Sequence, residues 1–508
     1  MKIYRLIHTN DIVIAVALMI LLLTAGSSWA QETKTVHILN ADKSTFNRAE
    51  DENLRKFIGN VAFEIDSTIL YCDTAYLNDK NKNIDAYGNI HIKVSDTLNI
   101  YGDILNYQGR TRIADIFGDV ELVDNTTTLT TDHLVYDRND AVASYTTGGE
   151  IVDSVNRLTS IKGFYKTEIK EFTFYDSVRV FNPDYTMRSD TLMYNTGSKV
   201  SYFYGPSWIE SEENTLYAEY GWYNTISEVT RLQKKAFINN GAQTLRGDSL
   251  FYNRNTGFGT ARRNVWMRDK EQNMIITGEY AEYDEQRFFA YVTDSARAVL
   301  IDERDSLFVS GDTLYATFDT TNKLQNVFAY FGARFFHHDL QGAADSLKYA
   351  AEDSVITMFK NPAIWAQESQ ITADTITITL NGTEVEYMEL FHKSLIASYD
   401  TLDWYNQIKG RYMKAFFKNN SLYKIETTGN AESIYYVKDE MDELKGVNKS
   451  VSGSLTIYFE DNKFSWITFV EEPNSVMYPL RDMSEKDRFF PDFEWQKARK
   501  PKNKDDVF

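Results

Sequence analysis

The chain of 508 residues carries a formal net charge of −19 at pH 7, and its 33 Tyr and 31 Phe against only 7 Pro favour β structure. So acidic a chain repels nucleic acid, and no local basic patch outside the C-terminal tail offsets this charge, so we expect no nucleic-acid partner. The single cysteine, Cys72, excludes an intrachain disulfide and a thiolate metal cage.

Residues 1–30 have the features of a secretory signal peptide. Lys2 and Arg5 give a positively charged start, Ile12 to Leu23 form an apolar run, and Ser28-Trp29-Ala30 supplies the small residues that signal peptidase reads. We therefore predict a periplasmic protein cleaved after Ala30, with outer-membrane association left open. An uncleaved anchor is the alternative, and no later apolar run is long enough to cross a membrane as a helix.

One short unit recurs along most of the chain and is clearest between Gly247 and Met267. Asp248, Leu250 and Tyr252 occupy alternate positions, as the side chains on one face of a strand do. A polar turn follows, and Val265 and Met267 then alternate on a second strand. The unit is therefore predicted to be strand, turn, strand, with the acidic residue opening the first strand.

An acidic residue opens each clear copy, and neighbouring copies usually start 29 to 33 residues apart; these residues are Asp73, Asp103, Asp132, Asp190, Glu219, Asp248, Glu279, Asp312, Asp345 and Asp374. A fixed period of this length indicates a solenoid, in which units stack because none can bury its apolar face alone. We predict an elongated all-β stack of about 12–13 strand-turn-strand rungs.

The predicted domain order follows from where the repeats begin and end. Residues 31–56 are polar and are expected to form a lead-in strand or N-terminal cap, and residues 57–470 hold the repeats, which weaken after residue 380. A division of the repeats into two or three consecutive modules is left open. Residues 471–508 depart from the pattern and are predicted to be a C-terminal cap with a charged tail.

The position two residues after each acid is Leu, Ile, Ala or Gly and is never charged, whereas the position three residues after it varies freely. A face with uniformly uncharged residues and a face with variable ones predict that the position two residues after the acid points inward.

Repeated Asp-x-Leu-x-Tyr followed by Gly-x-Val-x-Leu, as in Asp103-Leu105-Tyr107 with Gly118-Val120-Leu122, resembles the OstA/LptA-type family of lipopolysaccharide-transport proteins. The chain is most similar to the longer OstA-like proteins of the Bacteroidetes, over roughly residues 57–430. The resemblance implies a β-jellyroll of two facing sheets with an apolar groove that shields lipid A acyl chains. It also implies contacts with other transport components through exposed edge strands.

On this interpretation the protein is a non-enzymatic, periplasmic bridging protein that needs no cofactor and whose partners are lipopolysaccharide and other transport components. The side chains predicted to line the groove share the inward positions of the repeat; they are Ile90, Ile92, Leu105, Tyr107, Val120, Leu122, Leu134, Tyr136, Leu192, Tyr194, Leu250, Tyr252, Val265, Met267, Leu314, Leu347 and Tyr349. Tyr offers an apolar ring with a hydroxyl that can keep a hydrogen bond near the mouth. Whether these side chains line an open groove or fill the interior remains open.

Other functions fit the sequence less well. The repeated acids could form carboxylate pairs for glycoside cleavage, but their recurrence at one position indicates a structural use. His337 and His338 are adjacent, which on a strand sends them to opposite faces, so no metal site or catalytic residue is predicted. The alternatives kept are an outer-membrane β-barrel, which also has alternating strands and aromatics, and a β-helical enzyme acting on polysaccharide.

Overall fold

The computed structural model describes residues 36–46, 52–302, 306–382, 384–400, 404–418, 421–439, 441, 443–460 and 463–507. The predicted signal peptide, residues 1–30, lies outside this part of the chain. The chain divides into two compact units, Met1–Thr147 and Gly148–Phe508, and each is treated separately below.

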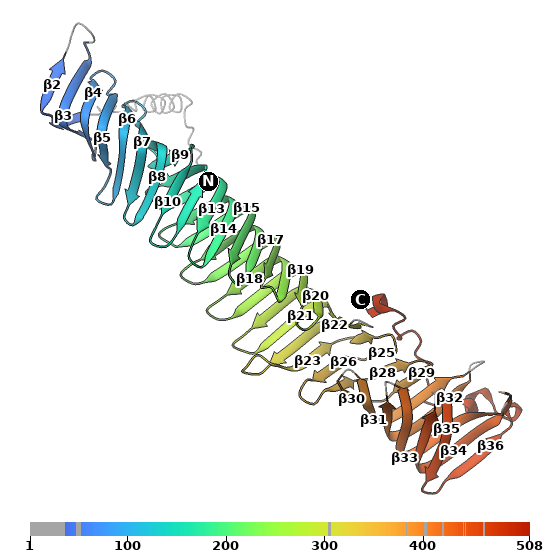
Figure 1. Cartoon of the computed structure of the whole chain (residues 1–508). Coiled ribbons are helices and arrows are strands. Elements are labelled where there is room, and N and C mark those ends of the chain that lie inside the picture. The colour runs from blue at the N-terminus through green and yellow to red at the C-terminus, as the bar shows by residue number, and fades with distance from the viewer. Residues whose placement is uncertain are drawn as a thin grey trace, which may run out of the picture. The chain divides into compact units, whose positions relative to one another are not determined.

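The first unit is built of β-strands alone in its described part (Figure 1). These strands are β1 (Val36–Asn40), β2 (Lys43–Phe46), β3 (Leu54–Ile65), β4 (Thr68–Asn78), β5 (Ile84–Lys93), β6 (Leu98–Gln108), β7 (Ile113–Asp124), β8 (Thr127–Asp137) and β9 (Val142–Tyr145).

The second unit begins with strands that are mostly long. They are β10 (Gly149–Val152), β11 (Arg157–Ser160), β12 (Lys162–Lys166), β13 (Glu171–Phe181), β14 (Tyr185–Asn195), β15 (Val200–Ser211), β16 (Thr215–Asn224), β17 (Val229–Asn239), β18 (Gln243–Asn253), β19 (Phe258–Asp269), β20 (Met274–Asp284), β21 (Phe289–Leu300) and β22 (Leu307–Phe318).

Shorter strands follow, and then long ones again. They are β23 (Leu324–Tyr330), β24 (Arg334–Phe336), β25 (Leu340–Ala343), β26 (Ser346–Ala350), β27 (Val355–Phe359), β28 (Ala363–Ala366), β29 (Ser369–Thr372), β30 (Thr375–Asn381), β31 (Glu384–Tyr399), β32 (Tyr405–Lys418), β33 (Ser421–Lys438), β34 (Leu444–Glu460), β35 (Lys463–Val470) and β36 (Asn474–Tyr478). The 3-10 helices η1 (Leu480–Asp482), η2 (Glu485–Arg488) and η3 (Lys504–Val507) complete the described elements.

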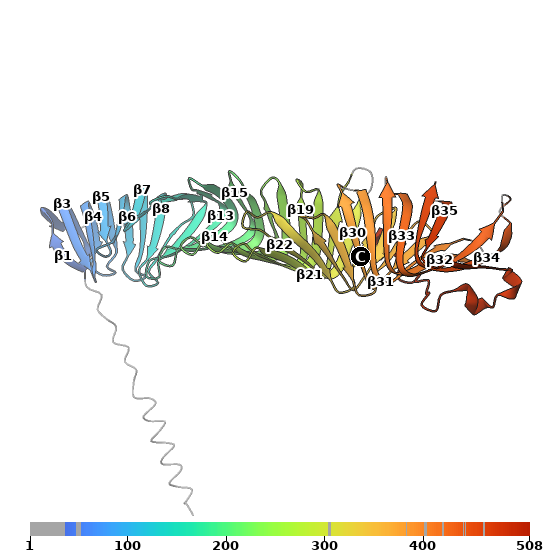
Figure 2. The same ribbon diagram turned by 90° about the horizontal axis from the view of Figure 1, so that it is seen from below.

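Consecutive long strands pair antiparallel, so each unit is a ladder of hairpins in chain order (Figures 1 and 2). The repeat clearest in the sequence is the hairpin of β18 and β19, in which Leu250 faces Ala261 and Leu245 faces Met267. The predicted all-β fold with strand-turn-strand units is therefore confirmed. Each repeat adds two neighbouring strands to the ladder, which is about 10 Å at the usual strand spacing.

Every long hairpin is bent at mid-strand by residues with positive φ. In β5 these are Gly88 and Asn89, with φ of 76° and 48°, and in β19 they are Arg263 and Asn264, with φ of 57° and 53°. The register of each pair shifts at this point, as expected for a bulge that bends a strand. In the middle of the second unit the bend interrupts the strand altogether, so that β23 and β24 lie on either side of it.

The repeated acids lie at these bends, which corrects the prediction that they open strands. Asp73 is the sixth residue of β4 and accepts a hydrogen bond of 2.8 Å from the Asn89 amide. Likewise Glu219 accepts one of 2.6 Å from Lys235, and Asp345 lies 3.4 Å from the Lys360 ammonium. The correction applies to β4 to β22, where the strand starts about five residues before the acid because alternation already begins there. Asp345 and Asp374 directly precede β26 and β30, as predicted.

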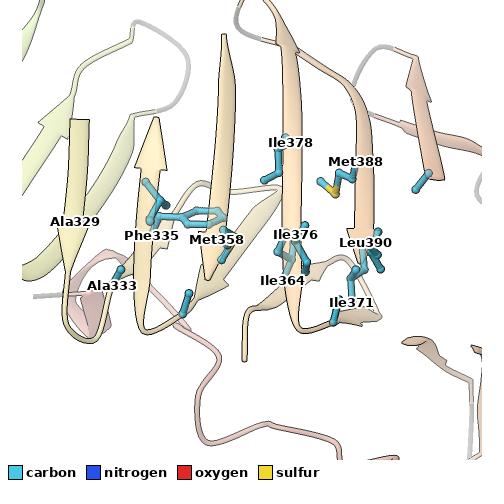
Figure 3. Packing of buried hydrophobic residues seen from close by; sticks show 14 of the residues in the cluster. Ala329, Ala333, Phe335, Met358, Ile364, Ile371, Ile376, Ile378, Met388 and Leu390 are labelled. Atoms are coloured by element: carbon cyan, nitrogen blue, oxygen red, sulfur yellow. The ribbon is translucent and has the colours of Figure 1, made fainter. Parts of the chain in front are cut away.

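The inward face is the one that carries the buried apolar side chains. In the second unit a large cluster on this face includes residues before a bend, such as Ala329 and Leu390, and residues after one, such as Phe335 and Ile396. Figure 3 shows side chains of this cluster gathered between the strands. The two halves of the bent strands therefore share one apolar interior in this part of the second unit.

The C-terminal segment, residues 480–507, packs on the outward face of the second unit. Met483 and Phe490 join Leu395, Tyr436 and Val447 in a separate apolar cluster, and these strand residues point away from the interior. The segment therefore covers the outside of strands from the second unit itself.

Two buried glutamines hold the backbone of this segment. Gln407 donates to the Arg488 carbonyl at 2.9 Å and accepts from the Phe490 amide at 3.0 Å. Gln370 does the same with the Glu494 carbonyl and the Gln496 amide, at 2.7 and 2.8 Å. Each glutamine side chain therefore donates and accepts one hydrogen bond with the backbone of the segment, as the backbone of a neighbouring strand would.

Candidate functional site

A continuous row of aliphatic side chains runs across the inward face of the second unit, one residue per strand and each opposite the next. We call it the aliphatic row; it comprises Met187, Ile209, Leu216, Ile238, Leu245, Met267 and Ile276. Met187 is buried, but the members from Ile209 to Ile276 are only half-buried. Apolar surface on the inside of the fold is therefore left partly uncovered between β15 and β20.

Small residues lie next to the bends on the same strands. The opposed pairs are Ser207 with Ala218, Ala236 with Gly247, and Ala296 with Gly311. These residues contribute little volume, which is why the larger neighbours in the aliphatic row are not fully packed. In a close-packed core large and small side chains interdigitate and leave little space. Here the small residues beside the bends leave the aliphatic row partly uncovered.

The half of each strand on the other side of the bend carries a second inward row with tyrosines on alternate strands. Tyr194, Tyr223, Tyr252 and Tyr283 belong to it, and each is opposed by a small residue such as Ser201, Thr230 or Gly259. Burial raises the pKa of Tyr194, Tyr223 and Tyr283 above that of a free phenol. The row is therefore uncharged at neutral pH.

The inward face of the first unit is packed differently. Its residues are nearly inaccessible, including Ile84, Ile100 and Ile116 at 0% exposure, and Leu105 at 2%. Large aliphatic side chains occupy the positions close to the bends, such as Ile90 and Val120. The interior of this unit is therefore filled.

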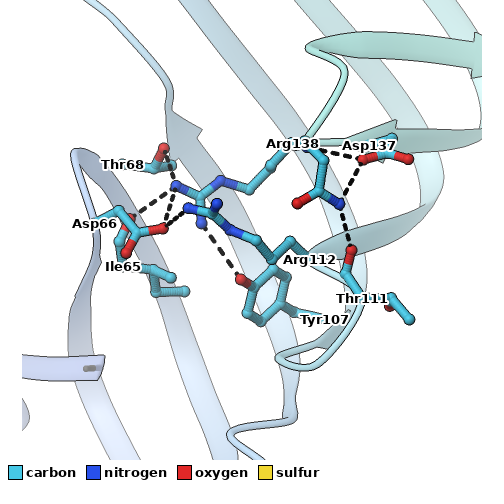
Figure 4. A network of polar contacts seen from close by, with 9 residues as sticks. Ile65, Asp66, Thr68, Tyr107, Thr111, Arg112, Asp137 and Arg138 are labelled. Atoms are coloured by element: carbon cyan, nitrogen blue, oxygen red, sulfur yellow. Dashed lines mark hydrogen bonds and ion pairs between the residues drawn. The ribbon is translucent and has the colours of Figure 1, made fainter. Parts of the chain in front are cut away.

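A polar network lies at the open ends of the first unit's strands (Figure 4). Asp66, in the turn between β3 and β4, is hydrogen-bonded to Arg112 and lies 3.5 Å from Arg138. Arg138 also donates to the Ile65 carbonyl at 3.0 Å and to the Tyr107 hydroxyl at 3.3 Å. Because Asp66 and the two arginines sit at opposite ends of the bent strands, the network joins the two sides above the filled interior.

All the residues predicted to line a groove lie on the inward face, and none is exposed. The fully buried ones are Ile90, Ile92, Leu105, Tyr107, Val120, Leu122, Leu134, Tyr136, Leu192, Leu250, Val265, Leu314 and Leu347, and the half-buried ones are Tyr194, Tyr252, Met267 and Tyr349. The structure brings Leu105 and Leu134 to either side of Ile116, and Leu314 and Leu347 to either side of Ala329. Their contact with lipid stays a prediction.

Sequence reasoning missed most of the aliphatic row. The missed residues lie upstream of a repeated acid or downstream of a bend, where the sequence pattern predicted no strand; they are Ile209, Leu216, Ile238 and Leu245. The available signal was the alternation that continues upstream of each acid, as in Leu245 and Gly247 before Asp248. It is weak because glycine and alanine interrupt it.

The residues considered for metal binding or catalysis have other surroundings. His337 and His338 lie in the turn between β24 and β25, not on a strand as expected, because the His337 amide and carbonyl pair with Leu340 across the turn. Asp248 is hydrogen-bonded to Asn264 and lies 3.7 Å from Arg263. Among the described residues, no group of three or more His, Cys, Asp or Glu side chains is arranged to hold a metal ion.

These features define a class: an all-β repeat protein in which bent antiparallel strands enclose an uncharged apolar inward face. Residues 33–190 match the family model of the OstA-like proteins, which confirms the predicted resemblance for that part of the chain. The matched range, residues 33–190, starts and ends earlier than the range of roughly residues 57–430 over which the sequence pattern showed the resemblance. No curated protein matches the chain.

A solved structure with a similar region is the crystal structure of LptH, the LptA-homologous periplasmic component of the conserved lipopolysaccharide transport device from Pseudomonas aeruginosa. The two chains are 12% identical over 23% of this chain and 84% of LptH, with a TM-score of 0.21. The described part of the present chain has no helix with the length and apolar character of a membrane span.

Proposed function

We propose that this chain is a non-enzymatic, periplasmic lipid-binding protein that takes part in lipopolysaccharide transport to the outer membrane. The observation that carries the proposal is the uncharged and half-buried aliphatic row from Ile209 to Ile276. Exposed apolar surface of this continuity on the inside of a fold is costly in water and suits an apolar ligand. The OstA-like match at residues 33–190 supports the transport role.

Acyl chains would lie between β15 and β20, where the small residues beside the bends leave room. Each acyl-chain methylene removed from water contributes about 0.8 kcal/mol to binding. Many similar weak contacts therefore hold the acyl chain without one position that binds it much more tightly than the others. The first unit's interior is filled, so we assign lipid contact to the second unit. Of the predicted lining residues, Tyr194, Tyr252 and Met267 fit this role best.

Other transport components would bind at the end strands. Strands β2 and β36 are exposed along their whole described length, and such edges offer unpaired backbone groups to a partner strand. The periplasmic location rests on the signal features of residues 1–30. Bound cargo would slide or be passed on without bond chemistry in this chain.

The test is site-specific photo-crosslinking in cells that make lipopolysaccharide. A photoreactive residue in place of Met267 should capture lipopolysaccharide, whereas the same residue at Met193, an outward position on β14, should not. A third variant at Ile92, which is 5% exposed in the filled first unit, should label at least tenfold less than the one at Met267. Equal labelling at 267 and 193 would indicate adsorption to the surface and refute the proposal.

A blocking variant provides a second measurement. Leu245 is half-buried in the aliphatic row between Ile238 and Met267, and Leu245→Trp would occupy uncovered space on the inward face. We expect it to reduce co-purified lipid several-fold. Circular dichroism must show unchanged strand content, so that loss of lipid is not caused by loss of the fold.

A further inference from the structure

A shallow depression lies on the outward side of strands β16 to β19, at their bends. Its volume is about 370 Å³, which is within the range of small-ligand sites. The side chains around it are Tyr217, Phe237, Arg246, Lys235, Asp248 and Asn264. Its aromatic and charged side chains point to the face of the sheet opposite the aliphatic row, and its base includes the small residues Ala236 and Gly247 at the bends.

One wall of the depression is aromatic. The Tyr217 and Phe237 rings stack with centroids 5.7 Å apart and planes inclined by 22°, and Trp208 lies 4.8 Å from Tyr217 and is 40% exposed. These residues are direct cross-strand partners in one outward row that continues through Arg246. The rings therefore form an apolar row in which Tyr217 and Phe237 cover each other and the tilted Trp208 ring is the most exposed.

The other side of the depression carries hydrogen-bonding groups of both kinds. The Asp248 carboxylate accepts from Asn264 at 3.3 Å, and Lys235 donates to Glu219 at 2.6 Å. Arg246 lies with its guanidinium 4.7 Å from the centroid of the Trp266 ring, and it forms no ion pair with any described carboxylate. Its charge is therefore available to an anion, which is unusual in a chain of net charge −19.

We propose that this depression binds a saccharide that carries an anionic substituent, either phosphate or carboxylate. A sugar ring presents an apolar C–H face, which suits the exposed Trp208 ring at the end of the aromatic row. Its hydroxyls need both donors and acceptors, which Asp248, Asn264 and Lys235 provide. Arg246 binds the anionic group, since guanidinium is well matched to phosphate and carboxylate. An acidic polypeptide fits less well because the strands here are paired on both sides and offer no free edge.

A second depression provides a natural comparison within the same unit. It lies at the bends between Asp345 and Asp374 and is lined by Ser346, Phe359, Lys360, Asn361 and Thr375. It has the same kinds of polar groups but lacks the stacked aromatic pair and the arginine. The saccharide site is therefore assigned to the first depression only.

The test is a titration of the purified full-length protein, free of lipid, followed by tryptophan fluorescence and calorimetry. We expect a heparin-derived hexasaccharide to bind, and maltohexaose, which is neutral, to bind at least tenfold more weakly. Phe237→Ala and Arg246→Gln should each weaken binding of the anionic hexasaccharide about tenfold. The matched variant Phe359→Ala should leave it unchanged.

Two further ligands distinguish the sources of such a saccharide: a phosphorylated oligosaccharide released from lipopolysaccharide, and a uronate-rich oligosaccharide. Tighter binding of the first indicates that the site recognises the cargo's own sugars. Tighter binding of the second indicates a separate polysaccharide, and either result supports the site. Binding of polyglutamate as tight as that of the hexasaccharide, with no effect of Phe237→Ala, would show charge attraction alone and overturn the proposal. So would the absence of binding to every anionic saccharide.

Discussion

At the scale of single residues, the fold depends on the residues that bend each strand. A left-handed conformation costs a residue with a side chain about 1–2 kcal/mol, so glycine is favoured at the first bend position, as in Gly88 and Gly118. Where another residue stands there, as Arg263 does, a charged contact with the acid of the neighbouring strand offsets part of this cost. The recurring acid is therefore structural, which explains its regular spacing without any catalytic role.

Gly205 tests the bend directly. Its φ is +79°, and an added Cβ would lie 2.7 Å from a carboxylate oxygen of Asp190. Gly205→Ala should lower the free energy of unfolding by about 2–4 kcal/mol, from backbone strain and the clash together. Gly241 has a φ of +85° but nothing within 4 Å, so Gly241→Ala should cost only about 1–2 kcal/mol. Urea denaturation compares the two; equal losses would contradict the contact with Asp190.

Cys72 provides a test of burial in the first unit. Desolvation, with a smaller contribution from Asp73, raises the pKa of this thiol to about 12. The folded state therefore keeps the proton, so at pH 8 the native protein should react with a maleimide at least a hundredfold more slowly than the urea-unfolded chain. Rapid labelling of the native protein at pH 8 would contradict this.

The same shift makes a prediction for stability against pH. The thiol of the unfolded chain loses its proton near the ordinary cysteine pKa of 9.0, whereas the folded thiol does not until about 12. The unfolded state therefore binds fewer protons in that window, and the stability contributed by Cys72 is present below pH 9 and falls as the pH rises above it. Cys72→Ala should flatten the dependence of the urea midpoint on pH between 9 and 11.

At the scale of strands, the same hairpin gives two kinds of interior. In the first unit large side chains beside the bends fill the interior, and the Asp66 network closes the strand ends. In the second unit alanine and glycine beside the bends leave the aliphatic row half-buried. The difference depends on side-chain volume at a few inward positions and not on strand number or pairing.

Arg138 tests the network at the strand ends. Its side chain is 10% exposed and contacts Asp66, Ile65 and Tyr107. Arg138→Ala leaves the Ile65 carbonyl without this donor and Asp66 with Arg112 alone, and should destabilise the first unit by about 1–3 kcal/mol. Lys93→Ala removes an exposed ion pair with Asp96 and should cost less than about 0.5 kcal/mol. Similar losses for both variants, by urea denaturation, would argue against a structural role for the network.

At the scale of the whole molecule, the chain uses its own C-terminal segment as a covering layer for the second unit. Leu395 and Tyr436 point outward from their strands yet are almost completely buried, because Met483 and Phe490 of the segment 480–507 lie over this face. The Gln370 and Gln407 side chains replace backbone partners that a neighbouring strand would supply.

Removal of residues 480–508 should therefore expose an apolar outward face. We expect binding of a hydrophobic dye, and hydrogen exchange at least tenfold faster in β29 and β32, because buried Gln370 and Gln407 lose their partners. Exchange in β4 to β7 of the first unit should stay unchanged and serves as the internal control. Unchanged exchange in β29 and β32 would show that the segment contributes little to stability.

The sequence alone determined the repeat and the face that turns inward. Alternation at Asp248, Leu250 and Tyr252, recurring at a fixed interval, was enough because strand periodicity is a local property of the backbone. The resemblance to OstA-like proteins also came from these local motifs. Every predicted lining residue lies on the inward face for the same reason.

The tertiary structure decided what local pattern could not. The acids lie at bends because the bend is formed by residues on the neighbouring strand, some 15 positions away, as for Asp73 and Asn89. Whether the interior is filled or half-open depends on side-chain volumes summed across several strands. The burial of Leu395 depends on Met483 and Phe490, which lie about 90 residues later in the chain. These are long-range contacts, and a single sequence read by period and propensity carries no information about them.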